Sequence, residues 1–451
     1  MFESVLVANR GEIARRIIRT VQRMGLQAIA VHSDVDRGLP FVREADEAIE
    51  IGPAPPAESY RNMDAVLEAA RRSRAQAVHP GYGFLAENAQ FARRVQDAGL
   101  VWVGPAPEVI EQMGDKINAR NLMAAAGVPV SRGTEAPVLD AAAGLVAGRD
   151  IGYPLMVKAS AGGGGMGMEV AEDEASLAEA FARVQSFAAR VFGDQAVLLE
   201  RFFPRVRHVE VQILGLADGR VVALGERDCS VQRRNQKLAE ETPAPGLPAT
   251  VRGRMLAAAV QAGEAVGYRN AGTVECLVDV DAGDFVFLEM NTRLQVEHPV
   301  TEMVLGLDLV EQQLLVAAGE ETSVDVASSA PSGHALELRI NAEDPTRFLP
   351  GPGAVTAWEE PAGQGVRVDS GYGPDTTVTP HYDSLMAKLV VHGADRDQVL
   401  ERARVAVASF RIEGPKVNLG FFTELLDNEE FVSGRYDTGI VARMRRPRPG
   451  G

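Results

Sequence analysis

The sequence predicts an α/β protein in which a doubly wound parallel sheet is followed by a small α+β unit and a larger α+β region. Three observations support this fold class. Short apolar runs alternate with helical patterns over the first hundred residues, four consecutive glycines lie between two expected strands, and strands dominate from Val206 onward. Alternation of apolar runs with helical stretches is typical of a parallel sheet covered by helices.

Four apolar runs in the N-terminal region are expected to be buried strands, at residues 5–8, 28–31, 75–78 and 101–103. Helical patterns begin near Ile13, Met63 and Asn88. Ligands of such sheets bind beyond the carboxyl ends of the strands. The polar turns 9–12 and 79–83 lie at that edge.

A new helical stretch begins around residues 113–116, and a small α+β unit is expected to follow it. That unit combines strands 155–158, 168–170 and 196–200 with a helix over 174–187. The later strands are expected at 209–214, 221–226, 273–280 and 285–291. Residues 322–333 are expected to form a surface loop, and the basic, Pro- and Gly-rich tail 443–451 is expected to be disordered.

Length and composition exclude several classes of protein. A chain of 451 residues is expected to form two to four domains. The net charge of -16 argues against a nucleic-acid footprint, although local basic clusters could still bind anions. The two cysteines, Cys229 and Cys276, exclude a disulfide framework and favour a reducing compartment. We expect no secretory signal and no membrane span, and hence a cytoplasmic protein, or an organelle-matrix protein after removal of a transit peptide.

The glycine loop KASAGGGGMGM runs from Lys158 to Met168. Glycines cost backbone entropy and pack nothing, but they let backbone N–H groups approach phosphates closely. Lys158 would add a positive charge at the end of the preceding strand. The loop is not a Walker motif, because no Gly-Lys-Ser/Thr precedes a helix. A flexible hairpin tip remains the alternative.

Two carboxylates, Glu275 and Glu289, lie within apolar strands. Strand alternation would place Glu289 on one face with Phe285, Phe287 and Asn291. Burying unpaired carboxylates is costly, whereas oxygen ligands suit a hard cation such as Mg²⁺. The alternative is a carboxylate paired with an arginine.

A third group of polar residues follows the second of these strands. Arg293, Gln295 and Glu297 stand at every second position, so their side chains could converge on a small anion, with Glu297 as a general base. Upstream, the basic segment 229–237 ends at Lys237, which could neutralise an anion or a transferring phosphoryl group. A solvated charged loop is the alternative for this segment.

Eight motifs together resemble biotin carboxylase, in that family's order and over nearly the whole chain. They are VANRGEIA, HPGYGFLAEN, MGDK, KASAGGGGMGM, ERDCSVQRRNQK, EETPAPG, FLEMNTRLQVEHPVTE and ELRINAEDP. The string EMNTRLQVEHPVTE is highly specific. The glycine loop is shared by many ATP-grasp enzymes.

The resemblance implies an ATP-grasp fold with a Rossmann-like N-terminal domain over 1–114. An ATP-grasp domain over 115–330 would contain a mobile lid, 131–203, and a C-terminal domain over 331–446 would precede the tail 447–451. The implied reaction is the ATP-dependent carboxylation of carrier-bound biotin by bicarbonate through carboxyphosphate. It is the first half-reaction of an acyl-CoA carboxylase, as in fatty acid biosynthesis. The partners would be a biotin carboxyl carrier and a carboxyltransferase, with neither nucleic acid nor membrane.

The resemblance also assigns roles to individual residues. ATP would contact Lys116, Lys158, Gly164, Gly165, Glu200, His208, Gln232, Asn235, Leu277 and Ile440. Two Mg²⁺ or Mn²⁺ ions would be held by Glu275, Glu289 and Asn291. Bicarbonate would bind Lys237, Arg293, Gln295 and Val296, with Glu297 as its base. Biotin would contact Tyr82 and Arg339, and the catalytic residues would be Glu297, Arg293, Lys237 and Arg339.

The chain departs from the family pattern at three places. Met166 replaces a basic residue of the lid loop, and Asn235 replaces a histidine beside the ribose in many members. At the dimer surface of the family, Arg19 and Arg367 are kept, but Arg23 stands in place of a glutamate and Gln364 in place of a phenylalanine. We therefore expect a weak homodimer, or none, through that surface.

The string LMAKL at 385–389 superficially resembles a biotin-accepting motif, but the order of its residues differs and we expect a strand there. Two other functions compete with biotin carboxylation. Another ATP-grasp ligase, such as a carboxyaminoimidazole synthase or half of a carbamoyl-phosphate synthase, would not require Lys237 or Arg339. A non-catalytic ATP-binding scaffold would be expected to have lost Glu297 or a metal ligand.

Overall fold

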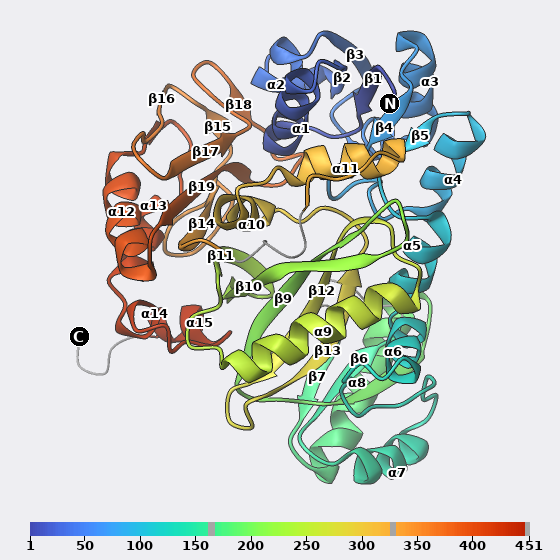
Figure 1. The fold of residues 1–451 in the computed structure, drawn as a ribbon. Coiled ribbons are helices and arrows are strands. Elements are labelled where there is room, and N and C mark those ends of the chain that lie inside the picture. The colour runs from blue at the N-terminus through green and yellow to red at the C-terminus, as the bar shows by residue number, and fades with distance from the viewer. Residues whose placement is uncertain (161–166, 325–330, 447–451) are drawn as a thin grey trace.

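The computed structural model describes residues 1–160, 167–324 and 331–446. The glycines Gly162 to Gly165 and Met166 lie outside the described residues, as do part of the expected loop 322–333 and the last five residues of the tail. Figure 1 shows three layers of structure along the long dimension of the molecule: the N-terminal sheet, a large central sheet, and a small α+β unit at the opposite end.

The N-terminal region confirms the predicted doubly wound parallel sheet. Its five strands follow the order β3-β2-β1-β4-β5, and all are parallel. The strands are β1 (Ser4–Val7), β2 (Gln27–Ser33), β3 (Glu47–Gly52), β4 (Ala77–His79) and β5 (Val101–Trp102). The helices of this region are α1 (Gly11–Arg23), α2 (Pro40–Glu44), α3 (Met63–Ser73), α4 (Ala89–Asp97) and α5 (Pro107–Gly114), with short 3-10 turns at Asp34–Asp36 and Pro56–Glu58.

The apolar runs did not predict strand β3, because it lies at the sheet edge. Its sequence EAIEIG buries Ile49 and Ile51 on one face and leaves Ala48 and Glu50 exposed on the other. The alternating pattern is that of a half-buried edge strand rather than of a continuous apolar run.

The small α+β unit has a core of its own. Three antiparallel strands, β7 (Met168–Ala171), β6 (Leu155–Ala159) and β8 (Val197–Arg201), are packed against α7 (Ala141–Ile151) and α8 (Glu174–Phe192). Buried Leu155, Val157, Leu177, Phe181 and Leu199 form its centre. In Figure 1 this unit lies at the bottom, and α6 (Lys116–Ala125) precedes it in the chain.

One antiparallel sheet of eight strands spans the middle of the molecule. Its order is β13-β12-β9-β10-β11-β14-β19-β17. The strands are β9 (Val206–Gly215), β10 (Val221–Arg233), β11 (Gln236–Thr242), β12 (Asn270–Asp279), β13 (Asp284–Asn291), β14 (His334–Asn341), β17 (Val366–Ser370) and β19 (Leu385–Gly393). Because β11 pairs directly with β14, the sheet continues from the central region into the C-terminal region.

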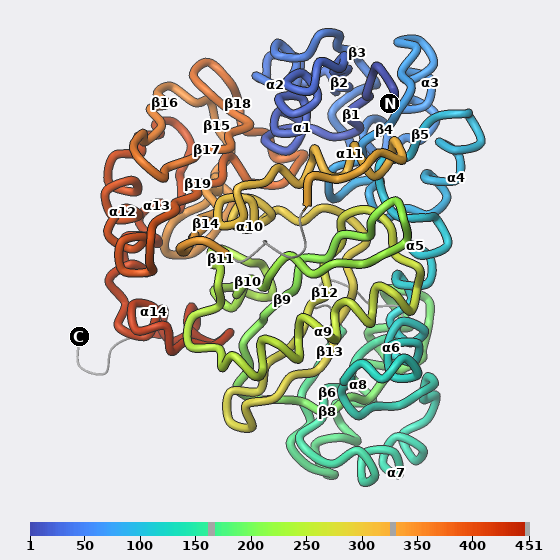
Figure 2. Tube along the Cα trace, in the orientation of Figure 1, coloured from blue at the N-terminus to red at the C-terminus, as the bar shows by residue number. Residues whose placement is uncertain are grey.

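Helices and short strands complete the central and C-terminal regions (Figure 2). The helices are α9 (Ala249–Ala265), α10 (His298–Leu305), α11 (Leu309–Ala318), α12 (Arg396–Ser409), α13 (Leu419–Leu426), α14 (Glu429–Val432) and α15 (Ile440–Met444). The short strands are β15 (Gly353–Ala354), β16 (Ala357–Glu359), β18 (Thr377–Val378) and β20 (Arg411–Glu413). Among the described residues, no helix combines the length and apolarity that crossing a membrane requires.

The structure excludes one alternative from the sequence and corrects two expectations. The segment 229–237 is not a solvated loop: β10 and β11 run through it and meet at Arg234 and Asn235, which both have positive φ. In β13, a bulge at Leu288 breaks the expected alternation, since Glu275 pairs with Glu289 while Cys276 pairs with Phe287. Arg443, which was expected to belong to a disordered tail, instead lies in α15.

Because of the bulge, β13 contributes side chains both to a hydrophobic core and to the cavity wall. Phe285, Phe287 and Met290 belong to one hydrophobic core, whereas Glu289 and Asn291 line the main cavity of the molecule, which Phe287 also contacts. An extra residue in one strand of an antiparallel pair re-aims the side chains that follow it. The carboxylate therefore reaches the cavity although the phenylalanines before it face the core.

An arginine with no exposed surface, Arg227 on β10, ties the central sheet to α10. Its Nε donates to Glu210 Oε1 at 2.6 Å, and its Nη1 donates to Gln212 Oε1 at 2.8 Å and to Thr301 Oγ1 at 3.0 Å. Removing one partner of a buried pair leaves the other charge uncompensated.

We predict that Arg227→Met lowers the free energy of unfolding by about 3–5 kcal/mol, because Glu210 loses its guanidinium partner. Urea denaturation of the variant checks this. Arg220→Met is the control, since Arg220 makes only an exposed pair with Asp218 and should change stability little. Equal midpoints for the two variants would contradict the prediction.

Candidate active site

A cavity of 870 Å³ lies where the N-terminal sheet, the small α+β unit and the central sheet meet. It is lined by turns of the N-terminal region, by Lys158 and Glu200 of the α+β unit, and by the strands β9 to β14. The turn 9–12 and Tyr82 are among its lining residues, as expected for turns at the carboxyl ends of parallel strands.

Most residues expected to contact ATP line this cavity. They are Lys116, Lys158, Glu200, His208, Gln232, Asn235 and Leu277. Lys158 Nζ lies 2.5 Å from Glu200 Oε2, which links two strands of the α+β unit. Ile440 does not join them: it is fully buried in the C-terminal core, and Thr438 lines the cavity instead. Gly164 and Gly165 lie outside the described residues.

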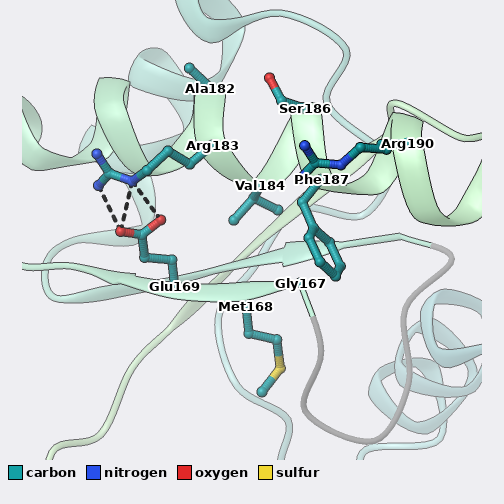
Figure 3. A pocket seen from close by; sticks show the side chains of 9 residues that line it. All are labelled: Gly167, Met168, Glu169, Ala182, Arg183, Val184, Ser186, Phe187 and Arg190. Carbon is teal, nitrogen blue, oxygen red and sulfur yellow. Dashed lines mark hydrogen bonds and ion pairs between the residues drawn. The ribbon is translucent and has the colours of Figure 1, made fainter.

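A second, open groove of 580 Å³ lies on the α+β unit between β7 and α8. Figure 3 shows Arg183 directed at Glu169, with Nη2 2.6 Å from Oε1, and Phe187 pointing down from the helix. Met168 lines both this groove and the main cavity, which places β7 between the two. Arg183 is thus already paired with the carboxylate of Glu169.

The three expected metal ligands are brought together by the pairing of β12 with β13. Glu275 lies directly across from Glu289, and Asn291 Nδ2 donates to Glu275 Oε1 at 2.9 Å. Burial, and then the charge of Glu275, raise the pKa of Glu289. Burial opposes the ionisation of Glu275, but Lys237 and His208 hold its pKa below the usual range. Two facing carboxylates and an amide oxygen fit a divalent cation, which would relieve their repulsion.

Lys237 lies at the deep end of the cavity and makes three ion pairs. Its Nζ is 2.6 Å from Glu210 Oε2, 2.9 Å from Glu275 Oε1 and 2.6 Å from Glu297 Oε1. Burial alone would lower the pKa of Lys237, but the three carboxylates raise it well above its usual value. The ammonium group therefore stays charged.

Arg293 and Gln295 lie beside this cluster. Arg293 Nη1 donates to Gln295 Oε1 at 2.7 Å, and Arg293 Nη2 donates to Asn291 Oδ1 at 3.1 Å. Arg293 Nε is also 3.1 Å from Glu87 Oε2. Lys237, Arg293, Gln295 and Val296 all line the cavity, and so they offer two positive charges and an amide to a small anion.

Glu297, at the start of α10, is fully buried between two cations. Its Oε1 pairs with Lys237, and its Oε2 accepts from Arg339 Nη2 at 2.9 Å. Burial opposes ionisation, yet Lys237 and Arg339 bring the pKa of Glu297 well below the usual range. The carboxylate is therefore unprotonated at neutral pH and able to accept a proton. Cys229 Sγ, 3.7 Å away, is the third side chain against it.

The two residues expected to contact biotin also belong to the cavity wall. Both Tyr82 and Arg339 line the cavity, and Tyr82 donates to Glu12. Glu12 Oε2 is in turn 3.0 Å from Nζ of the fully buried Lys388, which also donates to the Val296 carbonyl at 2.9 Å.

Sequence reasoning missed several charged residues around the site. They are Glu87, Glu210, Arg227, Glu240 and Lys388. Some signal was present for Glu210 and Lys388, which each stand between apolar residues, but not for Arg227, which stands between Glu226 and Asp228. Their partners are on distant strands, however, and only the folded sheet brings them together.

Comparison with known proteins covers almost the whole chain. Residues 1–110 match the family described as "Biotin carboxylase, N-terminal domain", residues 115–324 match "Carbamoyl-phosphate synthase L chain, ATP binding domain", and residues 337–443 match "Biotin carboxylase C-terminal domain". Biotin carboxylase 2 of Bacillus subtilis is 46% identical over 98% of this chain and 99% of that protein. The biotin carboxylase of Pseudomonas aeruginosa is 47% identical over 96% of each chain.

Solved structures are equally similar. The biotin carboxylase–β-γ-ATP complex from Campylobacter jejuni superposes with a TM-score of 0.94 at 43% identity, covering 98% of this chain and 99% of that one. The biotin carboxylase domain dimer of Hydrogenobacter thermophilus 2-oxoglutarate carboxylase, with MgADP, ADP and bicarbonate, has a TM-score of 0.92 at 39% identity and covers 98% of both chains. These similarities confirm the ATP-grasp fold, and this chain belongs to the biotin carboxylase family.

Proposed function

We propose that this protein uses ATP to carboxylate carrier-bound biotin with bicarbonate, giving carboxybiotin, ADP and phosphate. The observation that carries the proposal is Glu297: an ionised carboxylate, fully buried between Lys237 and Arg339 beside an anion-binding wall. A competing ATP-grasp ligase would not need Arg339 at this place, and a non-catalytic scaffold would not need Glu297.

The nucleotide would lie along the wall formed by Lys116, Lys158, His208, Gln232 and Asn235. Glu275, Glu289 and Asn291 fit Mg²⁺ by their oxygen ligands, and the bound ion would neutralise charge on the phosphates of ATP. Lys158 could release Glu200 and turn toward a phosphate, because both groups line the cavity.

Bicarbonate would be held by Lys237, Arg293, Gln295 and the backbone of Val296. Glu297 would take its proton, and the resulting nucleophile would attack the γ-phosphate of ATP and displace ADP, giving carboxyphosphate. Release of CO₂ from that intermediate leaves phosphate, which would take the proton from the biotin ureido nitrogen. Arg339 would stabilise the negative oxygen that then develops on biotin, next to Tyr82, and the biotin nitrogen would attack CO₂ to form carboxybiotin.

The carrier and the final acceptor of the carboxyl group belong to other parts of the system. The segment 385–389 forms part of interior strand β19, and its Lys388 is fully buried, so it cannot accept biotin. Relatives differ in acceptor: one is named as part of a pyruvate carboxylase, from Methanothermobacter thermautotrophicus, and another belongs to a 2-oxoglutarate carboxylase. We propose that a biotin carrier, on another chain or on a segment outside residues 1–451, and a carboxyltransferase complete the reaction here.

The surface expected to form a dimer is altered by an ion-pair network within the chain. Arg23 Nη2 lies 2.6 Å from Asp308 Oδ2 and 2.8 Å from Glu311 Oε2, while Gln364 is exposed. Arg19 is 46% exposed and has only Glu44, at 3.9 Å, as a described partner. Arg23 is thus paired with carboxylates of its own chain. Because it is positively charged, it cannot form an ion pair with an arginine of a partner. We propose that any homodimer through this face is weak.

Replacing Glu297 by Gln keeps the size of the side chain but removes the base. We expect bicarbonate-dependent ATP cleavage to fall by roughly 10²–10⁴-fold, the usual contribution of a general base. Steady-state phosphate release measures this, with Glu264→Gln on exposed α9 as the control. Turnover that is unchanged in Glu297→Gln would overturn the assignment of Glu297.

The α+β unit, residues 131–203, is predicted to close on ATP, because phosphoryl transfer needs water excluded and product must still leave. Hydrogen exchange should therefore show greater protection of β6 and β8 amides with MgATP than without it. Helix α9, which lies outside the lid, serves as the internal reference. Equal protection of the unit in both states would contradict closure.

Sedimentation at micromolar concentration is expected to show a monomer or a weakly associating dimer. Two changes across a two-fold interface each count twice, so the loss of a glutamate and of a phenylalanine weakens it doubly. A tight dimer whose affinity is unaffected by Arg19→Glu would show that this face does not decide the oligomeric state.

A further inference from the structure

Two buried glutamates face each other in the middle of the central sheet, and Arg339 connects one of them to Glu297. Glu240 on β11 and Glu337 on β14 are directly paired across the antiparallel ladder. They are 1% and 0% exposed. Like charges directly opposite one another destabilise a sheet, and burial increases their repulsion because little solvent screens it.

The hydrogen bonds of the pair are unevenly distributed. Glu240 Oε1 accepts from Arg339 Nε at 2.6 Å and lies 2.5 Å from Arg339 Nη2. Within the described part of the chain, Glu240 Oε2 and both oxygens of Glu337 have no hydrogen-bond partner. Three buried acceptor oxygens without a donor would be very costly if both groups were charged.

The surrounding cations do not provide the missing donors. Lys388 on β19 faces Glu337, but its Nζ donates to the Val296 carbonyl and pairs with Glu12. Arg339 shares its Nη2 between Glu240 and Glu297, and Lys237 acts on Glu240 only at longer range. Glu297 adds a further negative charge to the surroundings of both carboxyl groups.

The titration behaviour agrees with this geometry. Burial raises the pKa of Glu240 to about 7, although Arg339 opposes the change. Burial also raises the pKa of Glu337 well above its usual value, against the field of Lys388. Two interacting carboxyl groups on directly opposed residues titrate as a pair, in two steps that belong to both.

We propose that Glu240 and Glu337 share a single proton and together act as positioning residues for Arg339. One carboxyl group donates its proton to the other, which satisfies two of the three bare oxygens and leaves one negative charge on the pair. Glu240 then holds the guanidinium by two N–H groups, while Nη2 of the same guanidinium also reaches Glu297. This inference rests on the proposed role of Arg339 beside biotin.

The shared proton sets the net charge around Arg339. With the proton present, Arg339 faces Glu297 and one further negative charge. When the proton is lost, a second negative charge on the pair competes with the oxygen that develops charge on biotin. The pair keeps its proton below its upper pKa and loses it above, so biotin-dependent turnover should fall as pH rises through that value.

Infrared spectroscopy tests the proton directly, without reference to activity. The protein should show the C=O band of a protonated carboxylic acid at neutral pH, which diminishes at higher pH and is absent from Glu337→Gln. Glu241→Gln is the matched control, since Glu241 adjoins Glu240 on β11 and His334 and Arg396 overcome its burial to lower its pKa to about 2. That variant should keep the band. No titrating band in the unsubstituted protein, or an undiminished band in Glu337→Gln, would overturn the proposal.

The pH profile provides a second test. The amide introduced by Glu337→Gln would donate an N–H to Glu240 at every pH and so imitate the protonated pair. One pH unit above the upper pKa, the unsubstituted enzyme should retain about a tenth of its biotin-dependent rate, whereas Glu337→Gln should show no such decline. The same alkaline decline in both would refute the shared proton. If the unsubstituted enzyme showed no bicarbonate-dependent ATP cleavage, the proposed function would be refuted instead. The infrared test of the shared proton would be unaffected, because it does not depend on activity.

Discussion

The ammonium group of Lys237 is the interaction on which the rest of the site depends. It joins Glu210 of β9, Glu275 of β12 and Glu297 before α10, three carboxylates that could not otherwise be buried close together. Arg227 supports the same cluster from β10 through Glu210. Anion binding, metal binding and proton transfer therefore share one network of charges, and a change at any one of them alters the pKa values of the others.

The sequence was sufficient to predict the fold class and most of the cavity wall. Parallel strands with intervening helices leave a local signature, and so the N-terminal sheet was predicted from apolar runs. The strings around Lys158, Glu275 and Glu289 pointed to phosphates and a hard cation from residue chemistry. The roles of Tyr82 and Arg339 came only from resemblance to a family, because neither residue has a local pattern that indicates a carboxylation site.

Other features depend on contacts that no local pattern encodes. The bulge at Leu288 changes which residues of β13 face the cavity, and strict alternation gave the wrong face for the two phenylalanines. The facing of Glu240 and Glu337 requires the pairing of strands about a hundred residues apart, as Ala239 opposite Leu338 shows. Ile440 was carried over from the family pattern, but the turn before α15 presents Thr438 to the cavity instead.

The continuity of the central sheet through β11 and β14 also bears on how this protein could be recombined. A chimera joined near residue 330 would have to pair interior strands from two different parents, and fragments separated there would each expose a row of unpaired backbone groups, a template for aggregation. The α+β unit is different, because its sheet and its hydrophobic core are its own. It is the segment that could be exchanged between relatives with the least damage, and hence the place where nucleotide handling could diverge while the carboxylation chemistry is retained.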